Sequence, residues 1–334
     1  MNILSHIRTA RHLLPATTWL PAALAFLFLT LSCQKSPLDS PQDPTTTPRI
    51  PIEFGVADKW TKATISNDET LKAADGGFKV WAWFQGNNSG EMFGESGIGV
   101  YWDRSKSAWT YENPRYWMPG TYDFFAIHPQ NAASVSHTAN GYKLTYNVSN
   151  QADLIVATNA GIDGSTPPDY VNLNFNHVLS QINFEARSDA DDLGAILYGI
   201  DFIGICDEGI RYTSGWDASS TGVQDGEYIH NTPATDIPTD MYKPIVAGIM
   251  MIPQTLTNVK IRVRYYGQKA DGKLGELASE PISLLTEECT EWLPGYKYTY
   301  QIPVKHNGQI QINTPEITKW ESVSGGSFIV NTPN

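Results

Sequence analysis

The sequence is poor in the residues from which most active sites are built. Its 334 residues include 3 cysteines and 7 histidines, and the histidines are scattered along the chain. There is no Gly-x-Ser-x-Gly nucleophile motif, no His-Glu-x-x-His, no phosphate-binding loop and no paired-cysteine zinc spacing. We therefore expect no catalytic residues, no metal site and no cofactor, and the sequence argues against an enzyme.

Positive charge is also scarce. The 23 Lys and Arg residues are outnumbered by 35 Asp and Glu residues, which gives a formal net charge of -12 at pH 7. Phosphate backbones and anionic membrane surfaces repel an acidic chain. Nucleic acid is therefore not an expected partner.

Sustained helical periodicity is absent too, whereas period-two alternation of apolar and polar residues recurs. The 27 Gly and 21 Pro divide the chain into short segments, and the 10 Trp and 16 Tyr favour strands. The pattern predicts an all-β protein, and its length suggests two domains. We expect two tandem β-sandwiches, residues 50–166 and 167–334, with the boundary in the Pro/Gly-rich loop 163–169.

Two stretches indicate where buried strands lie. Residues 78–84 are apolar on both faces, which predicts a central strand. In residues 171–186, VNLNFNHVLSQINFEA, the apolar residues occupy odd positions up to Phe175 and even positions from Val178. A period-two pattern cannot change face without an irregularity. We therefore expect the first strand of the second domain here, with a bulge or bend near 177–179.

His177 lies at this change of phase and has two interpretations. It could act in catalysis, but the sequence places no acid or nucleophile beside it. It could instead be a half-buried histidine that is hydrogen-bonded at the bulge. We favour the structural interpretation.

The first 32 residues are typical of a signal peptide. Arg8 and Arg11 precede an apolar stretch, 19–31, that is too short to span a bilayer. The segment ends in LTLSC at Cys33, which is similar to a bacterial lipobox, where the cysteine is diacylated and becomes the new N-terminus. An ordinary signal peptide with an incidental cysteine is the alternative. A lipid on Cys33 would anchor the chain without spanning the membrane, and residues 33–49 would form a flexible tether.

The other two cysteines, Cys206 and Cys289, also have two interpretations. Export would permit a disulfide between them. Both are equally explained as small buried hydrophobic residues. Sequence alone does not place them within bonding distance.

A short strand is expected at residues 50–56, directly after the tether. Ile52, Phe54 and Val56 share one face, Glu53 lies on the other, and Pro51 is typical of an edge or the start of a strand. The polar segment that follows contains Lys59 and Lys62. A protease could enter such a segment, since cleavage needs mobile, unpaired backbone.

Several motifs together resemble the fimbrillin family, the Mfa-like or type V pilus-subunit lipoproteins of Bacteroidales. The resemblance covers nearly all of the mature chain and also includes the lipobox-like segment. The motifs are Asp153-Leu154-Ile155, Phe175-x-His177-x-Leu179-Ser180, Ile252-Pro253-Gln254-Thr255, Trp292-x-Pro294-Gly295-x-x-Tyr298 and Trp320-Glu321.

The resemblance implies two transthyretin-like β-sandwich domains, export as a lipoprotein to the outer membrane, and assembly with other fimbrial subunits by strand exchange. A trypsin-like protease would remove the first strand, with Ile52, Phe54 and Val56. The family has Thr-Arg-Ala after this strand, and this chain has Lys62 in place of the Arg, with Lys59 and Arg49 as alternative sites. A terminal strand of the next subunit would fill the groove. Residues 309–330 are the candidate donor here, with Ile310, Ile312, Phe328 and Val330 as its apolar side chains.

Two other classes of protein share this export route and composition. A glycan-binding surface lipoprotein would present a row of three or more exposed Trp or Tyr rings, because sugar rings pack on aromatic faces. A structural lipoprotein that faces the periplasm would need no such feature. Exposure of the aromatic residues therefore discriminates the first of these from a fimbrial subunit.

Overall fold

The computed structural model describes residues 49–56, 71–73, 76–188, 196–269, 271–304 and 310–320. Strands dominate these ranges, beside the short helices η1 (Val148–Asn150) and α2 (Ala218–Thr221), which confirms the all-β prediction. In this part of the chain no helix has the length and hydrophobicity needed to cross a membrane. The signal peptide, Cys33, the tether up to residue 48, Lys59, Lys62, Phe328 and Val330 lie outside the described residues.

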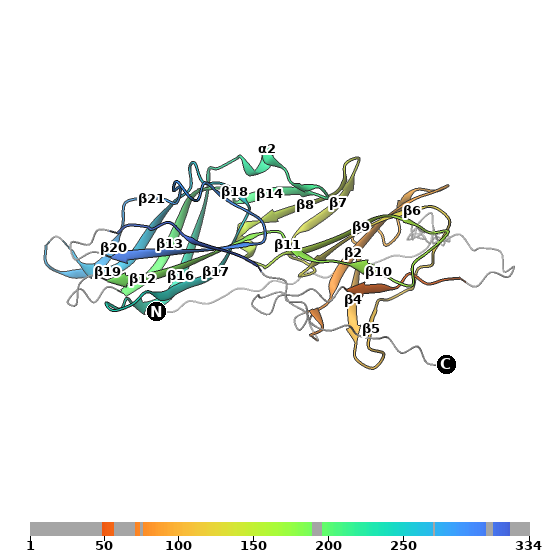
Figure 1. Ribbon diagram of the computed structural model, residues 1–334, viewed down its shortest axis with the longest axis horizontal. Helices are drawn as coiled ribbons and strands as arrows, with labels where there is room; N and C mark the ends of the chain where they lie inside the picture. Colours follow the sequence, from red (N-terminus) through yellow and green to blue (C-terminus); the bar gives the residue numbers. More distant parts are fainter. Residues whose placement is uncertain are drawn as a thin grey trace, which may run out of the picture. The chain divides into compact units, whose positions relative to one another are not determined.

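Strand β2 (Phe78–Gln85) lies at the centre of the largest sheet in the described residues (Figure 1). Its antiparallel neighbours are β6 (Thr121–His128) on one side and β4 (Ile98–Asp103) and β3 (Gly90–Glu91) on the other. Beyond β6 follow β9 (Ile155–Asp163) and β11 (Asn176–His177), and beyond β4 follows β5 (Ala108–Thr110). The predicted central strand is therefore confirmed.

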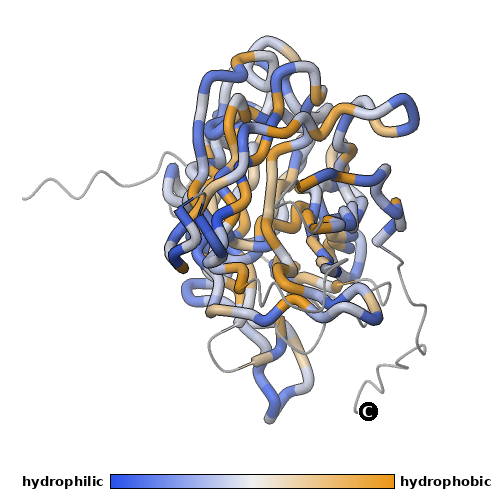
Figure 2. Tube along the Cα trace, turned by 90° about the vertical axis from the view of Figure 1, so that its left-hand side faces the viewer, coloured by the Kyte–Doolittle hydropathy of each residue, from blue (hydrophilic) through white to orange (hydrophobic). Residues whose placement is uncertain are grey.

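The strand is apolar on both faces because it contributes to two hydrophobic clusters. Phe78 and Val80 point into the first cluster, which also contains Phe54, Phe124 and Leu173 and is called core A below. Trp81 points the other way, into a larger cluster, called core B below, which it shares with Phe125, Phe184 and Tyr300. Hydrophobic stretches of the tube lie mostly inside the molecule, and hydrophilic stretches are frequent at its outer loops (Figure 2).

A second sheet combines strands from both sides of loop 163–169. It contains β7 (Ser134–Thr138), β8 (Gly141–Asn147), β14 (Glu208–Tyr212) and β15 (Gly215–Trp216). Strands β8 and β14 pair in antiparallel register, with Tyr146 opposite Gly209. The buried side chains of β8 belong to core B, so core B is built from both halves of the sequence.

Two further sheets contribute alternate side chains to core B. One sheet is β17 (Lys243–Met251), β12 (Ser180–Ser188), β23 (Tyr296–Val304) and β24 (Glu316–Lys319), in that order. The other is β16 (Gly226–Asp236), β13 (Ile196–Ile205), β19 (Lys260–Gln268) and β20 (Leu274–Ala278), and β21 (Ile282–Ser283) also pairs with β19. A short pair, β18 (Gln254–Thr255) with β22 (Glu291–Trp292), lies beside them in sequence.

Residues 171–186 change phase as predicted, but they do not form one bulged strand. They are divided among β10 (Val171–Leu173), β11 and β12. Phe175 belongs to core A and Val178 to core B, so the phase change is the passage from one core to the other. Strand β10 pairs with residues near the N-terminus, and β11 pairs with β9. The division into two transthyretin-like domains at 163–169 stays a prediction.

Cys206 and Cys289 are buried thiols that are not joined by a disulfide. Burial raises the pKa of Cys206 to about 11 and also raises the pKa of Cys289. A thiol with a raised pKa is a poor nucleophile, because the thiolate is the reactive form. Of the two interpretations, the structure supports small buried hydrophobic residues.

Candidate functional site

The first strand is held by neighbours on both of its sides. At its start, Ile52 N donates to Arg115 O at 2.8 Å and Trp117 N donates to Ile50 O at 2.9 Å, around an antiparallel bridge. Further along, β1 (Phe54–Val56) pairs in parallel with β10, and Val171 N donates to Glu53 O at 2.7 Å. Because successive residues of a strand point their backbone groups in opposite directions, residues 115–117 and β10 lie on opposite sides of this segment. Residues 50–52 thus contact one neighbour, and β1 pairs with β10 alone in a two-stranded sheet.

The predicted alternation of side chains along this strand is confirmed. Ile52 is 1% exposed and Phe54 is 5% exposed, whereas Glu53 is exposed and Val56 is partly buried against core A. The Phe54 ring lies among four aromatic rings, with centroid distances of 5.6 to 6.3 Å; they are Phe78, Phe93, Tyr111 and Phe124. The strand thus fills an aromatic pocket of core A.

Two tyrosines complete the contacts of this strand with its surroundings. The Tyr111 hydroxyl donates to the carbonyl of Ile52 at 2.8 Å and accepts from Arg115 N at 3.1 Å, so it joins the strand to its antiparallel neighbour. The ring of Tyr170 covers Gly55, where a Cβ atom would lie 2.3 Å from the ring. Glycine at position 55 lets this ring lie against the backbone.

The candidate cleavage residues differ in what the structure says of them. Lys59 and Lys62 fall in residues 57–70, outside the described residues. Arg49 is exposed, and its guanidinium carbon lies 5.8 Å from the centroid of the Tyr116 ring. A cut after Arg49 would leave Ile52 and Phe54 in place.

The C-terminal segment 310–320 is paired with β23 of its own chain. Ile310 forms a bridge with Val304, Asn313 N donates to Gln301 O at 3.1 Å, and β24 continues the pairing in antiparallel register. Ile310 and Ile312 pack partly buried against core B. All four residues of β24 are exposed, so little apolar burial holds this part of the segment.

Trp320 anchors the end of this segment at a junction between the two cores. It is 6% exposed, its backbone N donates to Gly295 O at 2.8 Å, and its Nε1 donates to Gln181 Oε1 at 3.0 Å. Its ring centroid lies 4.1 Å from that of His177. His177 Nδ1 in turn donates to Asp153 Oδ1 at 2.8 Å, and Asp153 is buried.

Two other motifs singled out from the sequence, Leu179-Ser180 and the segment from Trp292 to Tyr298, meet at the same junction. Gly295 N donates to Leu179 O and Ser180 Oγ donates to Leu293 O, both at 2.8 Å. The Tyr298 hydroxyl accepts from Leu293 N at 2.7 Å. His177 is therefore a hydrogen-bonded structural residue at the passage between the cores, as expected.

Sequence reasoning missed the partners of the first strand. Tyr111, Phe93 and residues 115–117 come from irregular segments, and no periodic signal marks them as neighbours of residues 50–56. It also missed the pair of Glu91 and Tyr142, in which the Tyr142 hydroxyl donates to Glu91 Oε2 at 3.0 Å and joins β3 to β8. Burial raises the pKa of Glu91 to about 7.

The described residues offer no group of three or more His, Cys, Asp or Glu that could hold a metal ion. The strongly exposed aromatic rings among them are tyrosines, and the tryptophans in these ranges are buried or partly buried. The exposed rings come from separate parts of the chain; they are Tyr101, Tyr116, Tyr170 and Tyr266.

Comparison with solved structures finds the same fold in fimbrial and adhesion proteins. A fimbrial protein from Bacteroides vulgatus ATCC 8482 is 17% identical, with a TM-score of 0.56 over 81% of this chain and 99% of that chain. A candidate cell adhesion protein from Bacteroides ovatus ATCC 8483 is 13% identical, with a TM-score of 0.50 over 82% and 98%. At these identities the similarity shows a shared fold.

The family is shown by the sequence itself. No curated protein sequence matches the chain. A family model described as fimbrillin-like matches residues 61–320, which is most of the chain and ends at the anchoring residue Trp320. This protein belongs to the fimbrillin-like family.

Proposed function

We propose that this protein is a structural subunit of a surface fimbria, without catalytic activity, and that it joins its neighbours by strand exchange. The observation that carries the proposal is the first strand. It inserts Ile52 and Phe54 into an aromatic pocket and forms hydrogen bonds on both sides. Its removal would leave an apolar groove lined by unpaired backbone groups of residues 115–117 and β10, which is the surface that a donated strand satisfies.

The energies involved suit a triggered exchange. Burying Ile52 and Phe54 contributes about 5 kcal/mol of gross hydrophobic free energy. A typical domain has a net stability of roughly 5–15 kcal/mol. The processed subunit would therefore be strongly weakened until another strand fills the groove, and a donor with apolar residues at alternate positions would restore the burial.

The processing steps are part of the same proposal. The chain would be exported as a lipoprotein, anchored in the outer membrane through a lipid on Cys33, and cut by a trypsin-like protease at Lys62 or at Lys59. Removal of the chain up to either lysine would take the whole first strand with it. Arg49 supports the proposal less well, because a cut there keeps residues 50–56 in the pocket.

The donor strand would come from residues 309–330 of a neighbouring subunit. Ile310 and Ile312 already pack against core B of their own chain, so supplying them would require this segment to leave β23. The exposure of all four residues of β24 favours such a release, and Trp320 opposes it. Phe328 and Val330, the other apolar pair, lie outside the described residues.

The experiment changes both candidate lysines, Lys59→Gln and Lys62→Gln, in the full-length protein expressed in its host. Polymer is measured as a ladder that resists boiling on denaturing gels. We expect the ladder to disappear in the double variant and to be retained in a Lys62→Arg variant. The matched control is Lys106→Gln, which removes a lysine with a 68% exposed side chain in a turn far along the chain. Undiminished polymer from the double variant would show that the groove is made in another way.

A row of aromatic rings for glycan binding has no support among the described residues. The exposed tyrosines belong to β4, to the segment before β6, to the segment before β10 and to β19, and the tryptophans in these ranges are not strongly exposed. We therefore do not advance a glycan-binding platform as a second function.

A further inference from the structure

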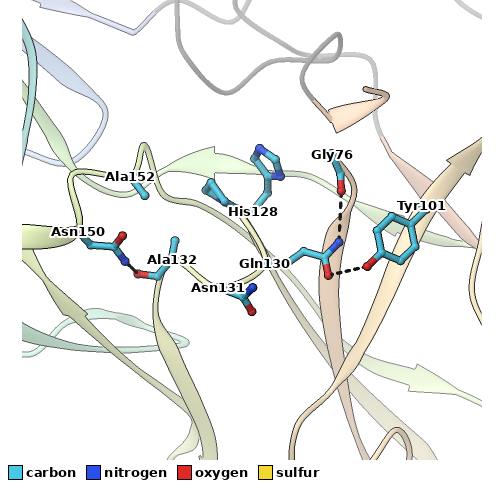
Figure 3. A pocket seen from close by; sticks show the side chains of 9 residues that line it. Gly76, Tyr101, His128, Gln130, Asn131, Ala132, Asn150 and Ala152 are labelled. Carbon is cyan, nitrogen blue, oxygen red and sulfur yellow. Dashed lines mark hydrogen bonds between the residues drawn. The ribbon is translucent and has the colours of Figure 1, made fainter. Parts of the chain in front are cut away.

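A pocket with a volume of about 520 Å³ opens between segments that are distant in the sequence (Figure 3). Its walls are the end of β6 and the loop that follows it, at residues 128–132, Gly76 just before β2, Tyr101 of β4, and Asn150 at the end of η1 with Ala152 beyond it. Pockets that bind small molecules have volumes of roughly 300–1,000 Å³. The pocket is therefore large enough for a small ligand, and it lies outside the first-strand site.

The residues that line this pocket carry no formal charge apart from the one titratable ring of His128. Three of them are amides, Gln130, Asn131 and Asn150, and each amide offers both donors and acceptors. A pocket with this lining favours neutral ligands rich in hydroxyl or amide groups, because it offers hydrogen-bond donors and acceptors but no opposite charge for a charged ligand.

The amides are held in different ways, which leaves some of their atoms for a ligand. Gln130 is fixed, since its Nε2 donates to Gly76 O and its Oε1 accepts from the Tyr101 hydroxyl, both at 3.3 Å. Asn150 Nδ2 donates to Ala132 O at 2.5 Å, and Asn150 Oδ1 has no hydrogen bond to a described residue. The amide of Asn131 is exposed and makes no hydrogen bond within the described residues.

His128 adds a hydrogen-bond acceptor, the Nε2 atom of its ring. It is 8% exposed, and its Nδ1 lies 2.6 Å from the Gly77 carbonyl oxygen. Because that oxygen can only accept, Nδ1 carries the proton, and burial lowers the pKa of the ring. In the neutral ring Nε2 is then an acceptor, and it has no hydrogen bond to a described residue.

Tyr101 supplies an aromatic surface at the same place. It is 49% exposed, and its hydroxyl is tied to Gln130, which fixes the position of the ring (Figure 3). Gly99 makes room for this pair, since a Cβ atom there would lie 2.8 Å from the Tyr101 hydroxyl and 2.9 Å from Gln130 Oε1. An exposed ring beside unpaired amide atoms can pack against an apolar face while the amides bind hydroxyl groups.

We propose that this pocket binds one ring of a neutral sugar, with Asn131, Asn150 and His128 Nε2 facing its hydroxyl groups and the Tyr101 ring packed against its C–H face. The site does not depend on strand exchange. Failure of one proposal would leave the other standing.

The test is saturation-transfer NMR on the full-length protein with four neutral probes at millimolar concentration: D-glucose, D-galactose, D-mannose and N-acetyl-D-glucosamine. We expect at least one probe to bind and Asn131→Ala to weaken its binding roughly tenfold, the equivalent of about 1.4 kcal/mol. Tyr101→Ala should have a similar effect. Tyr101→Phe should retain most of the affinity, because it keeps the ring.

The matched controls are Asn258→Ala and Tyr266→Ala, which remove an exposed amide and a 40% exposed ring from outside the pocket and should leave binding unchanged. We expect Asn131→Ala to fold, since the side chain is exposed and makes no hydrogen bond to a described residue, and a thermal melt verifies this. Absence of transfer to all four probes would overturn the proposal. Binding of a probe by Asn131→Ala and Tyr101→Ala that is as tight as its binding by the unmodified protein would also overturn it. A clear preference for the acidic sugar D-glucuronate over the neutral probes would do the same.

Discussion

Replacing Phe54 with alanine should cost this protein a large part of its stability. The side chain is 5% exposed and lies among four aromatic rings, at centroid distances of 5.6 Å to Tyr111, 6.0 Å to Phe124, 6.1 Å to Phe93 and 6.3 Å to Phe78. A buried Phe→Ala change typically costs about 3–5 kcal/mol, through lost burial and the cavity left behind. Phe78 and Phe124 belong to the paired strands β2 and β6, so this side of the cavity cannot readily collapse, and we expect a value in the upper part of this range.

The assay is denaturant unfolding of the full-length protein, with near-ultraviolet circular dichroism to follow the packing of the aromatic rings. Glu53→Ala is the matched control, because Glu53 belongs to the same strand but is exposed, and such surface changes usually stay within about 0.5 kcal/mol. A loss below about 1 kcal/mol for Phe54→Ala would refute the reasoning. It would mean that the first strand contributes little to the stability of core A. Its removal would then open no apolar groove that a donated strand has to fill.

Two further predictions concern the junction and the buried acid. Trp320→Ala should destabilise the fold by about 3 kcal/mol or more and expose residues 316–320 to limited proteolysis, because Trp320 is the buried residue that follows the four exposed residues of β24. Unchanged protease resistance would contradict this. Burial raises the pKa of Glu91 from 4.5 to about 7. Between these two pH values the folded protein retains a proton that the unfolded chain releases. The free energy of unfolding should therefore fall as the pH rises from 4.5 to about 7. Glu91→Gln should remove this dependence of stability on pH and stabilise the protein above pH 7 by about 1 kcal/mol. This figure is reduced for solvent screening because Glu91 is partly exposed. A plot of stability against pH like that of the unmodified protein would contradict the prediction.

Local pattern was enough to predict some elements of the fold. The apolar faces of residues 78–84 predict a strand with two buried faces, and β2 lies between β6 and β4 with a core on each side. The alternation in residues 50–56 predicts which side chains are buried, because the period of a strand is a property of the backbone alone. The change of phase at His177 predicts an irregularity, and the chain passes there from core A to core B.

Pairing could not be predicted from the same pattern, since it depends on residues that are far apart in sequence. Nothing in residues 50–56 indicates that their neighbours are 115–117 on one side and a parallel strand, β10, on the other. Nor does the alternation of Ile310 and Ile312 indicate that they already pack on core B of their own chain. The pocket at residues 128–132 was missed for the same reason, because Gln130 and Asn131 come from one loop and Asn150 from η1, and only the fold brings them together.

The most direct test of strand exchange is the N-terminal residue of the subunit in intact fibres, determined by mass spectrometry or Edman sequencing. If the first strand is removed as we propose, the mature subunit begins at Ala63, after Lys62, or at Trp60, after Lys59. A subunit that begins at Cys33 or Ile50 while incorporated in fibres would still carry Ile52 and Phe54. It would contradict the proposal that a neighbour's strand takes their place.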